Sequence, residues 1–241
     1  MSYFDKKLIA MDLDGTITQH KSPLTEECRF VLEELSSHYR LLMVCAGGCE
    51  RVYKQMGEFP QDIIGFYGMQ VSSVDNAGSL VIIENHAVAV DRADILERTE
   101  VLRNEFDFRD YDGDSVEFHA SGLLTFPILG TTAPLEKKLA FDPDRAKRRQ
   151  VYNRVREVFS DYTVFIGGTS SFDITPRPYN KLYAVDSYLC TVGLSRGDVV
   201  YFGDDYGPGG NDSDLFESDI EFVCIDDFKE FPNIARHLFL E

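Results

Sequence analysis

The sequence predicts an α/β protein with a doubly wound, Rossmann-like core built on a parallel sheet, and an inserted α+β domain. At both ends of the 241-residue chain, short apolar runs alternate with segments of helical periodicity, which is typical of β-α-β units. In the middle, strand-like runs flank short turn sequences, which indicates antiparallel hairpins. We therefore expect a core of residues 1–84 and 178–241 and an inserted domain of residues 85–177.

The two ends of the chain follow one pattern. Residues 7–11 (KLIAM) and 40–46 (RLLMVCA) are apolar enough for buried strands, and the helix between them carries its apolar face within residues 28–35. The order strand, helix, strand predicts parallel pairing. The final third repeats it, with a strand at 198–204, a short helix at 211–217, a strand at 220–225 and a closing helix at 228–238.

The middle of the chain is predicted to form hairpins around the turn sequences DNAG and ASG. Asp142 followed by Pro143 predicts a helix start, with Asp as the N-cap and Pro as the first helical residue. The expected strands of this region are 69–74, 79–84, 116–119, 123–129, 162–168 and 171–176.

The acidic composition excludes several classes of partner. The chain carries 24 basic and 41 acidic side chains, and its formal net charge of −17 opposes general binding to nucleic acid or to an anionic membrane surface. The five cysteines form no CxxC pair, which favours a reducing compartment over a disulfide framework or a zinc site. No apolar run approaches the roughly 18 residues of a membrane span. We therefore expect a cytoplasmic protein without nucleic-acid or membrane partners.

Two acidic motifs follow predicted strands of the core. Asp12 and Asp14 come directly after the first strand, and because alternate strand residues face the same side, both carboxylates should point the same way. Asp204 and Asp205 end a later strand, and a glycine-rich loop then leads to Asp212. The carboxyl ends of parallel strands share one edge of the sheet, which is where ligands bind.

A divalent metal is the simplest reason for such a cluster, because nearby carboxylates raise one another's pKa values unless a cation lies between them. Mg²⁺ prefers oxygen ligands and shares phosphate oxygens with its substrate. The structural alternative is a polar strand end with an Asp-Gly turn, and a glycine-rich turn with an Asn or Asp helix cap. Lys181, near a predicted helix start, could neutralise a phosphate at this edge, although a lone Lys there is more often exposed to solvent.

The pieces DLDGT, Lys181 and GDD with a GGND tail, in this order, resemble the haloacid dehalogenase superfamily of phosphoryl-transfer enzymes. The resemblance implies that Asp12 is the nucleophile, which forms an aspartyl-phosphate, and that Asp14 is the general acid and base. It also implies that Lys181 steadies the phosphoryl group and the nucleophile. Mg²⁺ would be held by Asp12, the main-chain carbonyl of Asp14 and Asp204, with Asp205 or Asp212 in support.

Within that superfamily, the chain resembles the eukaryotic-type phosphomannomutases, with a cap of type IIB, along nearly its whole length. The segments that carry this likeness are DLDGTIT, PILG near 130, LEKKLAF from 135, IGGTSSFDITP from 166 and YFGDDYGPGGND from 201. The resemblance implies that Ser171 and Asp173 bind sugar hydroxyls and that the inserted segment is a substrate-reading cap domain. If two chains pair, we expect a homodimer that forms through that cap.

The chain departs from the phosphomannomutase pattern in two places. That family holds the distal phosphate of a sugar phosphate with arginines, and the matching positions here are Lys21, His119, Thr131 and Lys138. Lys lacks the planar fork of Arg, and Thr lacks its charge, so these differences weaken a mutase more than a phosphatase. In the loop VCAGGCE, the superfamily has a Ser or Thr that binds the phosphate. The chain has Ala46 at that position, or Cys49 if the alignment of the loop is shifted. Lys21, His119 and Lys138 remain candidate substrate-binding residues.

We therefore predict a Mg²⁺-dependent phosphatase that hydrolyses a small phosphorylated metabolite, with a sugar phosphate as the expected substrate, through an aspartyl-phosphate on Asp12. The alternative is a phosphomannomutase that interconverts mannose 6-phosphate and mannose 1-phosphate. A third hypothesis, ranked below both, is a catalytically idle sugar-binding or interaction protein on the same scaffold. The intact acidic residues and Lys181 argue against the third hypothesis, whereas Ala46 supports it.

Overall fold

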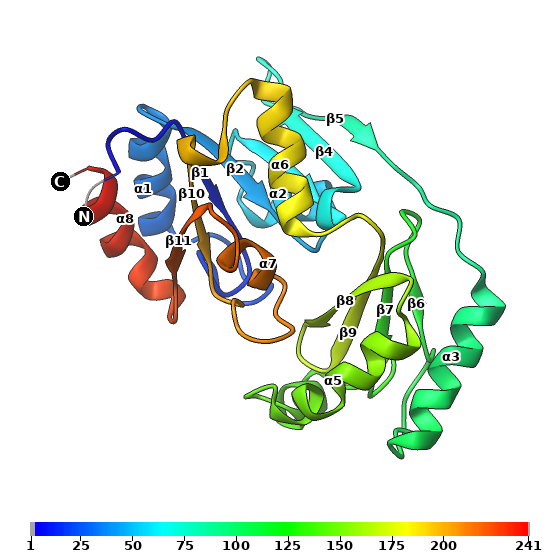
Figure 1. The fold of residues 1–241 in the computed structure, drawn as a ribbon. Coiled ribbons are helices and arrows are strands. Elements are labelled where there is room, and N and C mark those ends of the chain that lie inside the picture. The colour runs from blue at the N-terminus through cyan, green and yellow to red at the C-terminus, as the bar shows by residue number, and fades with distance from the viewer. Residues whose placement is uncertain (1–2, 241) are drawn as a thin grey trace. The chain divides into compact units, whose positions relative to one another are not determined.

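The computed structural model describes residues 3–240 and holds them in two units, each with its own sheet and hydrophobic core (Figure 1). The core unit contains the residues up to His86, Lys181–Tyr206 and the residues from Asp212 on. The inserted unit contains Ala87–Asn180 together with the loop Gly207–Asn211. The inserted unit thus begins at residue 87 where the sequence suggested 85, extends to 180 where it suggested 177, and includes a loop from the second acidic motif.

The core unit is built on a mostly parallel sheet. Its strands are β1 (Leu8–Met11), β2 (Arg40–Val44), β3 (Asp62–Gly65), β4 (Gln70–Val74), β5 (Leu80–Asn85), β10 (Val199–Gly203) and β11 (Glu221–Cys224). Their order in space is β11-β10-β1-β2-β3-β4-β5. Neighbours from β11 to β3 pair in parallel, whereas β3, β4 and β5 pair antiparallel. The hairpin around DNAG therefore extends one edge of the core sheet.

Helices cover both faces of this sheet (Figure 1). They are α1 (Glu26–Ser36), α2 (Cys49–Gln55), α6 (Lys181–Val192), α7 (Ser213–Phe216) and α8 (Phe231–Phe239), with 3-10 turns at Phe66–Gly68, Arg196–Asp198 and Phe228–Glu230. Side chains of α1 and α8 pack with Ile9 and Met11 of β1, and those of α6 and α7 pack with Leu8 and Ala10. This arrangement confirms the doubly wound α/β core. Among residues 3–240, none of the helices has both the length and the apolar character to span a bilayer.

The first crossover helix forms where the sequence pattern places it. Thr25 is the N-cap of α1, and its side chain accepts a hydrogen bond from the backbone N–H of Cys28. The buried residues of α1 are Cys28, Val31, Leu32 and Leu35. Their spacing keeps one stripe of the helix against the sheet, so the predicted β-α-β unit is confirmed.

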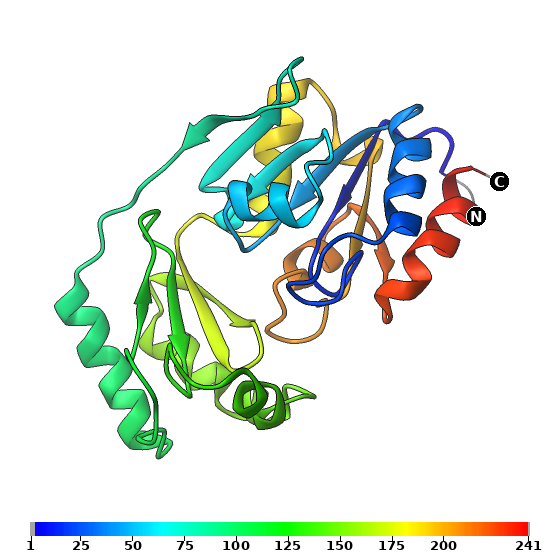
Figure 2. The same cartoon turned by 180° about the vertical axis from the view of Figure 1, so that it is seen from behind.

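The inserted unit is an antiparallel sheet with helices on one face (Figure 2). Its strands are β6 (Glu117–Phe118), β7 (Leu124–Pro127), β8 (Tyr162–Gly167) and β9 (Ser171–Pro176), and its helices are α3 (Arg92–Glu105), α4 (Leu135–Phe141) and α5 (Ala146–Val158). The strands lie in the order β6-β7-β9-β8. Ile95 and Leu102 of α3 and Val155 of α5 share one hydrophobic core with Phe126 and Phe172 of the sheet. The α+β character of the insertion is therefore confirmed.

The start of α5 differs from the prediction. The helix begins at Ala146, four residues after Asp142, and Arg145 is its N-cap residue with φ of 61°. Asp142 still accepts hydrogen bonds from the backbone N–H groups of Lys147 (2.9 Å) and Arg148 (3.1 Å). The prediction of the exact helix start was wrong because the carboxylate reaches over one additional turn of chain to satisfy the first helical donors.

Candidate active site

Asp12 directly follows β1 at the carboxyl edge of the core sheet. Leu8 and Ala10 of β1 pack with α6 and α7, and because alternate residues share a face, Asp12 continues on that side. The backbone N–H of Asp12 donates to the carbonyl oxygen of Phe202 (3.0 Å), so the pairing of β1 with β10 continues into the site. Asp12 is 6% exposed, which places its carboxylate among protein atoms.

Lys181, the first residue of α6, is the basic partner of Asp12. Its Nζ lies 2.9 Å from Oδ1 of Asp12 and 2.8 Å from Oδ1 of Asp212, and its side chain is fully buried. Burial alone would lower the pKa of Lys181, but the two carboxylates outweigh burial and raise that pKa above its usual range. Lys181 therefore stays charged and serves two carboxylates at once.

Asp204 follows β10, the neighbour of β1. Its Oδ1 accepts a hydrogen bond from the hydroxyl of Thr16 (2.9 Å). A Cβ atom at Gly15 would lie 2.5–2.7 Å from atoms of the Asp204 carboxylate, and the φ of Gly15 is +107°. Gly15 is therefore required twice, for the left-handed backbone of this turn and for the close approach of Asp204.

Asp212 precedes α7 and anchors Lys181. Its Oδ1 accepts hydrogen bonds from Nζ of Lys181 (2.8 Å) and from the hydroxyl of Tyr201 (2.8 Å), and its Oδ2 accepts one from the backbone N–H of Asp205 (3.1 Å). The backbone N–H of Asp212 donates in return to the carbonyl oxygen of Asp205 (3.0 Å). Asp205 thus holds Asp212 in place through its main chain.

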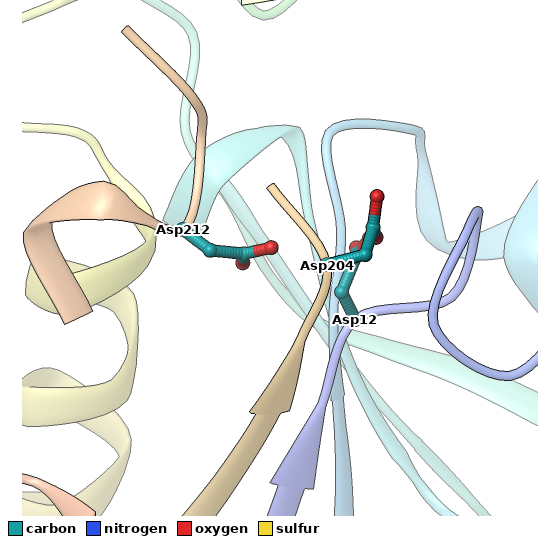
Figure 3. A group of neighbouring side chains, drawn as sticks. All are labelled: Asp12, Asp204 and Asp212. Atoms are coloured by element: carbon teal, nitrogen blue, oxygen red, sulfur yellow. The ribbon is translucent and has the colours of Figure 1, made fainter. Parts of the chain in front are cut away.

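The carboxylates of Asp12, Asp204 and Asp212 form one group, in which one oxygen of each lies within 4.8 Å of the others (Figure 3). Figure 3 shows Asp12 and Asp204 directly after neighbouring strands, with the carboxylate of Asp212 directed toward them. Among residues 3–240, this group of side chains does not include Asp14 or Asp205, two of the predicted metal ligands. The prediction for Asp14 concerned its main-chain carbonyl.

The electrostatics of this group favour a bound cation. Burial and the carboxylates of Asp212 and Asp204 raise the pKa of Asp12, although Lys181 opposes them. Burial and Asp212 also raise the pKa of Asp204 above its usual range. One buried lysine thus faces three buried or half-buried acids, which leaves excess negative charge in a poorly solvated region. Oxygen ligands in this number fit a hard divalent ion, so the group could hold a metal.

Asp14 contacts α2. Its Oδ1 accepts hydrogen bonds from Nε2 of Gln55 (2.7 Å) and from the backbone N–H of Lys21 (2.7 Å), and its Oδ2 pairs with Nη2 of Arg51 (3.3 Å). Burial would raise the pKa of Asp14, but the hydrogen bonds and the charge of Arg51 outweigh burial and hold that pKa below its usual range. Lys21 joins this network through its main chain, while its side chain is exposed.

The loop after β2 brings no hydroxyl group to the site. It consists of Cys45, Ala46, Gly47 and Gly48, and Cys49 begins α2. Sγ of Cys49 lies 3.4 Å from the carbonyl oxygen of Ile63 and 3.8 Å from that of Gln70. The thiol of Cys49 is therefore engaged with carbonyl groups of β3 and β4 and does not replace the superfamily's Ser or Thr.

Three of the predicted substrate-binding residues lie on or beside the sheet of the inserted unit. The hydroxyl of Thr125 donates to Oδ1 of Asp173 (3.3 Å) and contacts Nε2 of His119 at 3.2 Å. Asp173 alternates with Phe172 and Ile174, which belong to the hydrophobic core, so the chain His119–Thr125–Asp173 lies on the opposite face of the sheet. Ser171 lies two residues before Asp173 on β9 and therefore on the same face of the sheet. Its hydroxyl donates to the carbonyl oxygen of Gly167 (3.0 Å).

Thr131 and Lys138, the other positions that depart from arginine, contact each other. Nζ of Lys138 donates to the carbonyl oxygen of Thr131 (3.0 Å), and Oγ1 of Thr131 accepts a hydrogen bond from the backbone N–H of Asp114 (2.9 Å). These bonds order the segment between β7 and α4. The structure thus joins His119 to Asp173 through Thr125, and joins Lys138 to Thr131.

A buried ion pair supports the turn before Ser171. Nε of Arg148 lies 2.8 Å from Oδ2 of Asp142, and the two side chains are 1% and 0% exposed. Nη1 of Arg148 donates to the carbonyl oxygens of Gly167 (2.7 Å), Gly168 (3.1 Å) and Ser171 (3.1 Å). Within the basic segment 145–150 (RAKRRQ), Arg148 is thus buried and fixes the backbone of this turn.

Comparison with known protein families gives one match that covers just over half of the chain. The sequence model described as "Eukaryotic phosphomannomutase" matches residues 101–225. The chain belongs to the eukaryotic phosphomannomutase family. The matched region contains most of the inserted unit together with Lys181 and the acidic residues of the second motif.

Individual phosphomannomutases extend this relationship to most of the chain. A probable phosphomannomutase of Caenorhabditis elegans is 25% identical over 236 residues, which cover 88% of this chain and 86% of that protein. Human phosphomannomutase 1 is 23% identical over 235 residues, which cover 88% and 84%. The resemblance inferred from the motifs is therefore confirmed.

Solved structures of more distant proteins share the fold. An N-terminally truncated, IMP-bound IMP-nucleotidase of Plasmodium falciparum superposes with a TM-score of 0.73 at 12% identity, covering 96% of this chain and 67% of that one. Protein 0175 of Thermoplasma acidophilum gives a TM-score of 0.60 at 16% identity, covering 96% and 97%. At such low identity these likenesses concern the fold alone. With the family membership, they place the chain among the phosphoryl-transfer enzymes of the haloacid dehalogenase superfamily.

Sequence reasoning missed four side chains of the site. Tyr201 holds Asp212, Thr16 holds Asp204, and Arg51 and Gln55 hold Asp14. Thr16 is the last residue of the segment DLDGT and Tyr201 is the first of YFGDDYGPGGND, so their places within these motifs could have flagged both. Arg51 and Gln55 lie four residues apart on the helix after β2, a spacing that puts two polar side chains on one helical face.

Proposed function

We propose that this member of the phosphomannomutase family is a Mg²⁺-dependent enzyme that transfers the phosphoryl group of a hexose phosphate through an aspartyl-phosphate on Asp12. The observation that carries the proposal is the buried pair of Asp12 and Lys181, 2.9 Å apart, beside the carboxylates of Asp204 and Asp212. A nucleophilic carboxylate needs an adjacent cation, because the phosphoryl group that it attacks carries negative charge.

The oxygen that attacks is Oδ2 of Asp12, because Oδ1 accepts the hydrogen bond from Lys181. The bond from Oδ2 to phosphorus forms while the bond from phosphorus to the sugar oxygen breaks. Asp14 donates a proton to the departing oxygen and later takes one from the acceptor that attacks the aspartyl-phosphate. Mg²⁺ would be held by Asp12, Asp204 and the main-chain carbonyl of Asp14, with Asp205 or Asp212 in support, and would supply positive charge to the phosphoryl oxygens.

The inserted unit supplies sugar recognition in this proposal and acts as the cap domain. Ser171 and Asp173 present a hydroxyl and a carboxylate from the same face of β9, which suits neighbouring sugar hydroxyls. His119 and Lys138 would add positive charge for the distal phosphate. Pairing of two chains through the cap stays a prediction.

The acceptor of the phosphoryl group distinguishes two candidate reactions. Family membership favours a sugar hydroxyl, and therefore a phosphomannomutase, which ranked second in our sequence analysis behind a phosphatase. The comparisons thus favour the phosphomannomutase hypothesis over the phosphatase hypothesis. Hydrolysis remains the second candidate because Lys21, His119, Thr131 and Lys138 stand where the family has arginines.

A single assay separates the two reactions. Mannose 1-phosphate, a hexose bisphosphate activator and Mg²⁺ are incubated with the protein, and mannose 6-phosphate and inorganic phosphate are measured in the same sample. Formation of the 6-phosphate without stoichiometric release of phosphate supports the mutase, whereas release of phosphate alone supports the hydrolase. If Asp12→Asn matched the wild type in both products, the aspartyl-phosphate mechanism would be wrong.

A further inference from the structure

Arg51 occupies a place at the active site that the family's motifs do not explain. It lies on α2, and its Nη2 pairs with Oδ2 of Asp14 at 3.3 Å, while its Nη1 donates to Oε1 of Gln55 at 2.6 Å. Its side chain is 42% exposed, in contrast to the fully buried Lys181. The guanidinium group is therefore both fixed on the protein and accessible from solvent.

Gly47 makes this position possible. A Cβ atom at residue 47 would lie 2.1 Å from Nη2, 2.5 Å from Nε and 2.7 Å from Cζ of Arg51, so the guanidinium group rests on the bare backbone of the loop after β2. The backbone of Gly47 lies outside the left-handed region, so conformation alone does not require glycine there. The reason for glycine at this position is the space that Arg51 occupies.

The loop on which Arg51 rests is the one that brings no hydroxyl group to the site. Ala46, Gly47 and Gly48 carry no polar side chain, and the thiol of Cys49 contacts the carbonyl groups of Ile63 and Gln70. β2 is the parallel neighbour of β1, so this loop and Asp12 emerge at the same edge of the sheet. Burial and the carboxylate of Asp12 raise the pKa of the Cys45 thiol, directly after β2, well above its usual range, and Arg51 lies close enough to oppose them.

We propose that Arg51 binds the phosphoryl group that is transferred at Asp12, and that Gly47 provides the space for its guanidinium group. The inference rests on the proposed function, because it assigns the phosphoryl group to Asp12. Lys181 is shared between Asp12 and Asp212, and the proposed Mg²⁺ would be shared among carboxylates as well, so a phosphate dianion entering this acidic site gains from a further cation. The planar fork of Arg pairs with two phosphate oxygens, and the same group can keep its contact with Asp14.

The test compares inorganic phosphate binding and kinetics in the full-length protein with Mg²⁺ present. Arg51→Met is expected to weaken the Kd for inorganic phosphate about 10- to 100-fold, the range of one or two charge-assisted hydrogen bonds, and Arg51→Lys should lose less. The Kd for Mg²⁺ should change less than about two-fold, since Arg51 pairs with the side chain of Asp14, whereas Asp14 is proposed to hold the metal through its main-chain carbonyl. Lys54→Met, which removes an exposed positive charge from the same helix, is the matched control.

A second pair of variants tests the role of Gly47. Gly47→Ala should displace the guanidinium group and weaken phosphate binding as Arg51→Met does, and the double variant should be no weaker than Arg51→Met alone. Additive effects would overturn this role. Thermal unfolding confirms that each variant is folded.

The outcome separates this inference from the proposed function. An Arg51→Met Kd for phosphate equal to that of wild type or Lys54→Met would overturn the inference, even if the wild type converts hexose phosphates. Phosphate binding that depends on Arg51, in a protein that turns over no hexose phosphate, would support the inference and contradict the proposed function.

Discussion

The ammonium group of Lys181 lies 2.9 Å from Oδ1 of Asp12, and the two side chains are 0% and 9% exposed. The same ammonium group is shared with Asp212, so neither carboxylate is fully compensated. A buried charge that is left without its partner is strongly destabilising, whereas a solvent-exposed charge is screened by water. The pair proposed for catalysis is therefore also a structural element of the core unit, and loss of Lys181 should affect stability as well as activity.

Lys181→Met tests this double role. The substitution keeps much of the side-chain volume but leaves Asp12 and Asp212 buried without their cation, so we expect a loss of about 3–5 kcal/mol in the free energy of unfolding at neutral pH. Urea denaturation of the metal-free protein measures this loss. Lys7→Met is the control, because the Lys7 side chain is exposed to solvent in its ion pair with Asp198, and its effect should be much smaller. Equal losses for the two variants would contradict the assignment.

In the absence of metal, the stability that Asp12 and Asp204 contribute should fall as pH rises. An Asp in the unfolded chain has a pKa of roughly 4, whereas burial and neighbouring carboxylates raise the pKa values of Asp12 and Asp204 in the folded protein. Between those values the folded state binds more protons than the unfolded state, so these two groups contribute stability that is present at low pH and is lost as pH rises through the folded pKa values.

Mg²⁺ should reverse this trend, because a cation among the carboxylates removes their repulsion and competes with protons. We expect the increase in Tm on addition of Mg²⁺ to be larger at pH 8 than at pH 5. Calorimetry or a fluorescence melt at matched ionic strength measures the difference. Asp204→Asn should reduce both the decline with pH and the Mg²⁺ effect. A Tm increment that does not depend on pH would argue against the cluster as the metal site.

The sequence predicted the parts of the fold that are encoded locally. β1 and β10 are apolar throughout because both faces of a parallel strand are buried, and α1 has its apolar residues on one stripe. The sequence pattern did not predict helix α3, because the apolar residues of α3 do not lie on one face. Leu96 and Val101 are exposed, whereas Ile95 and Leu102 are buried. β3 is only four residues long, too short to establish a period.

Part of the candidate site could also be predicted from short sequence segments. Asp12 and Asp204 end neighbouring parallel strands, so their meeting could be predicted once the sheet was assumed. The position of Arg51 could not, because it depends on a contact with Asp14, 37 residues away, and on the empty space beside Gly47. Such contacts are set by tertiary packing, which a pattern in one sequence does not record.

The buried pair of Asp142 and Arg148 should stabilise the inserted unit. Breaking it with Arg148→Met leaves Asp142 buried without its partner and frees the carbonyl groups of Gly167 and Ser171, so we expect a loss of about 3–5 kcal/mol at pH 7. Arg154→Met, which removes another arginine of α5 and breaks its solvent-exposed pairs with Glu105 and Glu157, is the control and should change stability far less. Denaturation curves for the two variants provide the comparison.

The pH dependence of the same pair has the opposite sign to that of the active site. Burial would raise the pKa of Asp142, but hydrogen bonds from Arg148 and the backbone outweigh burial and hold that pKa below its usual range. The pair thus contributes stability that is complete above the unfolded pKa of roughly 4 and is lost as pH falls through the folded pKa. The stability difference between wild type and Asp142→Asn should therefore shrink as pH falls from 7 toward 3, and a constant difference would contradict this account.

Thr125 should set the affinity for the sugar without taking part in the chemistry. Its hydroxyl joins Nε2 of His119 (3.2 Å) to Oδ1 of Asp173 (3.3 Å), and therefore fixes the carboxylate that is proposed to bind sugar hydroxyls. Thr125→Val keeps the shape of the side chain but removes this link, so the KM for a hexose phosphate should rise roughly five- to ten-fold, as expected for one lost hydrogen bond, with kcat little changed.

Comparison of two substrates isolates the role of Thr125. An aryl phosphate has no sugar hydroxyls, so its KM should be the same in wild type and Thr125→Val. Thr163→Val is the matched control, since Thr163 alternates with the core residue Val164 of β8 and lies on the same face of the sheet as Thr125. If Thr125→Val raised the KM of both substrates equally, or lowered kcat as strongly as it raised KM, the hydroxyl would act on the phosphoryl group or on the fold, and not on the sugar.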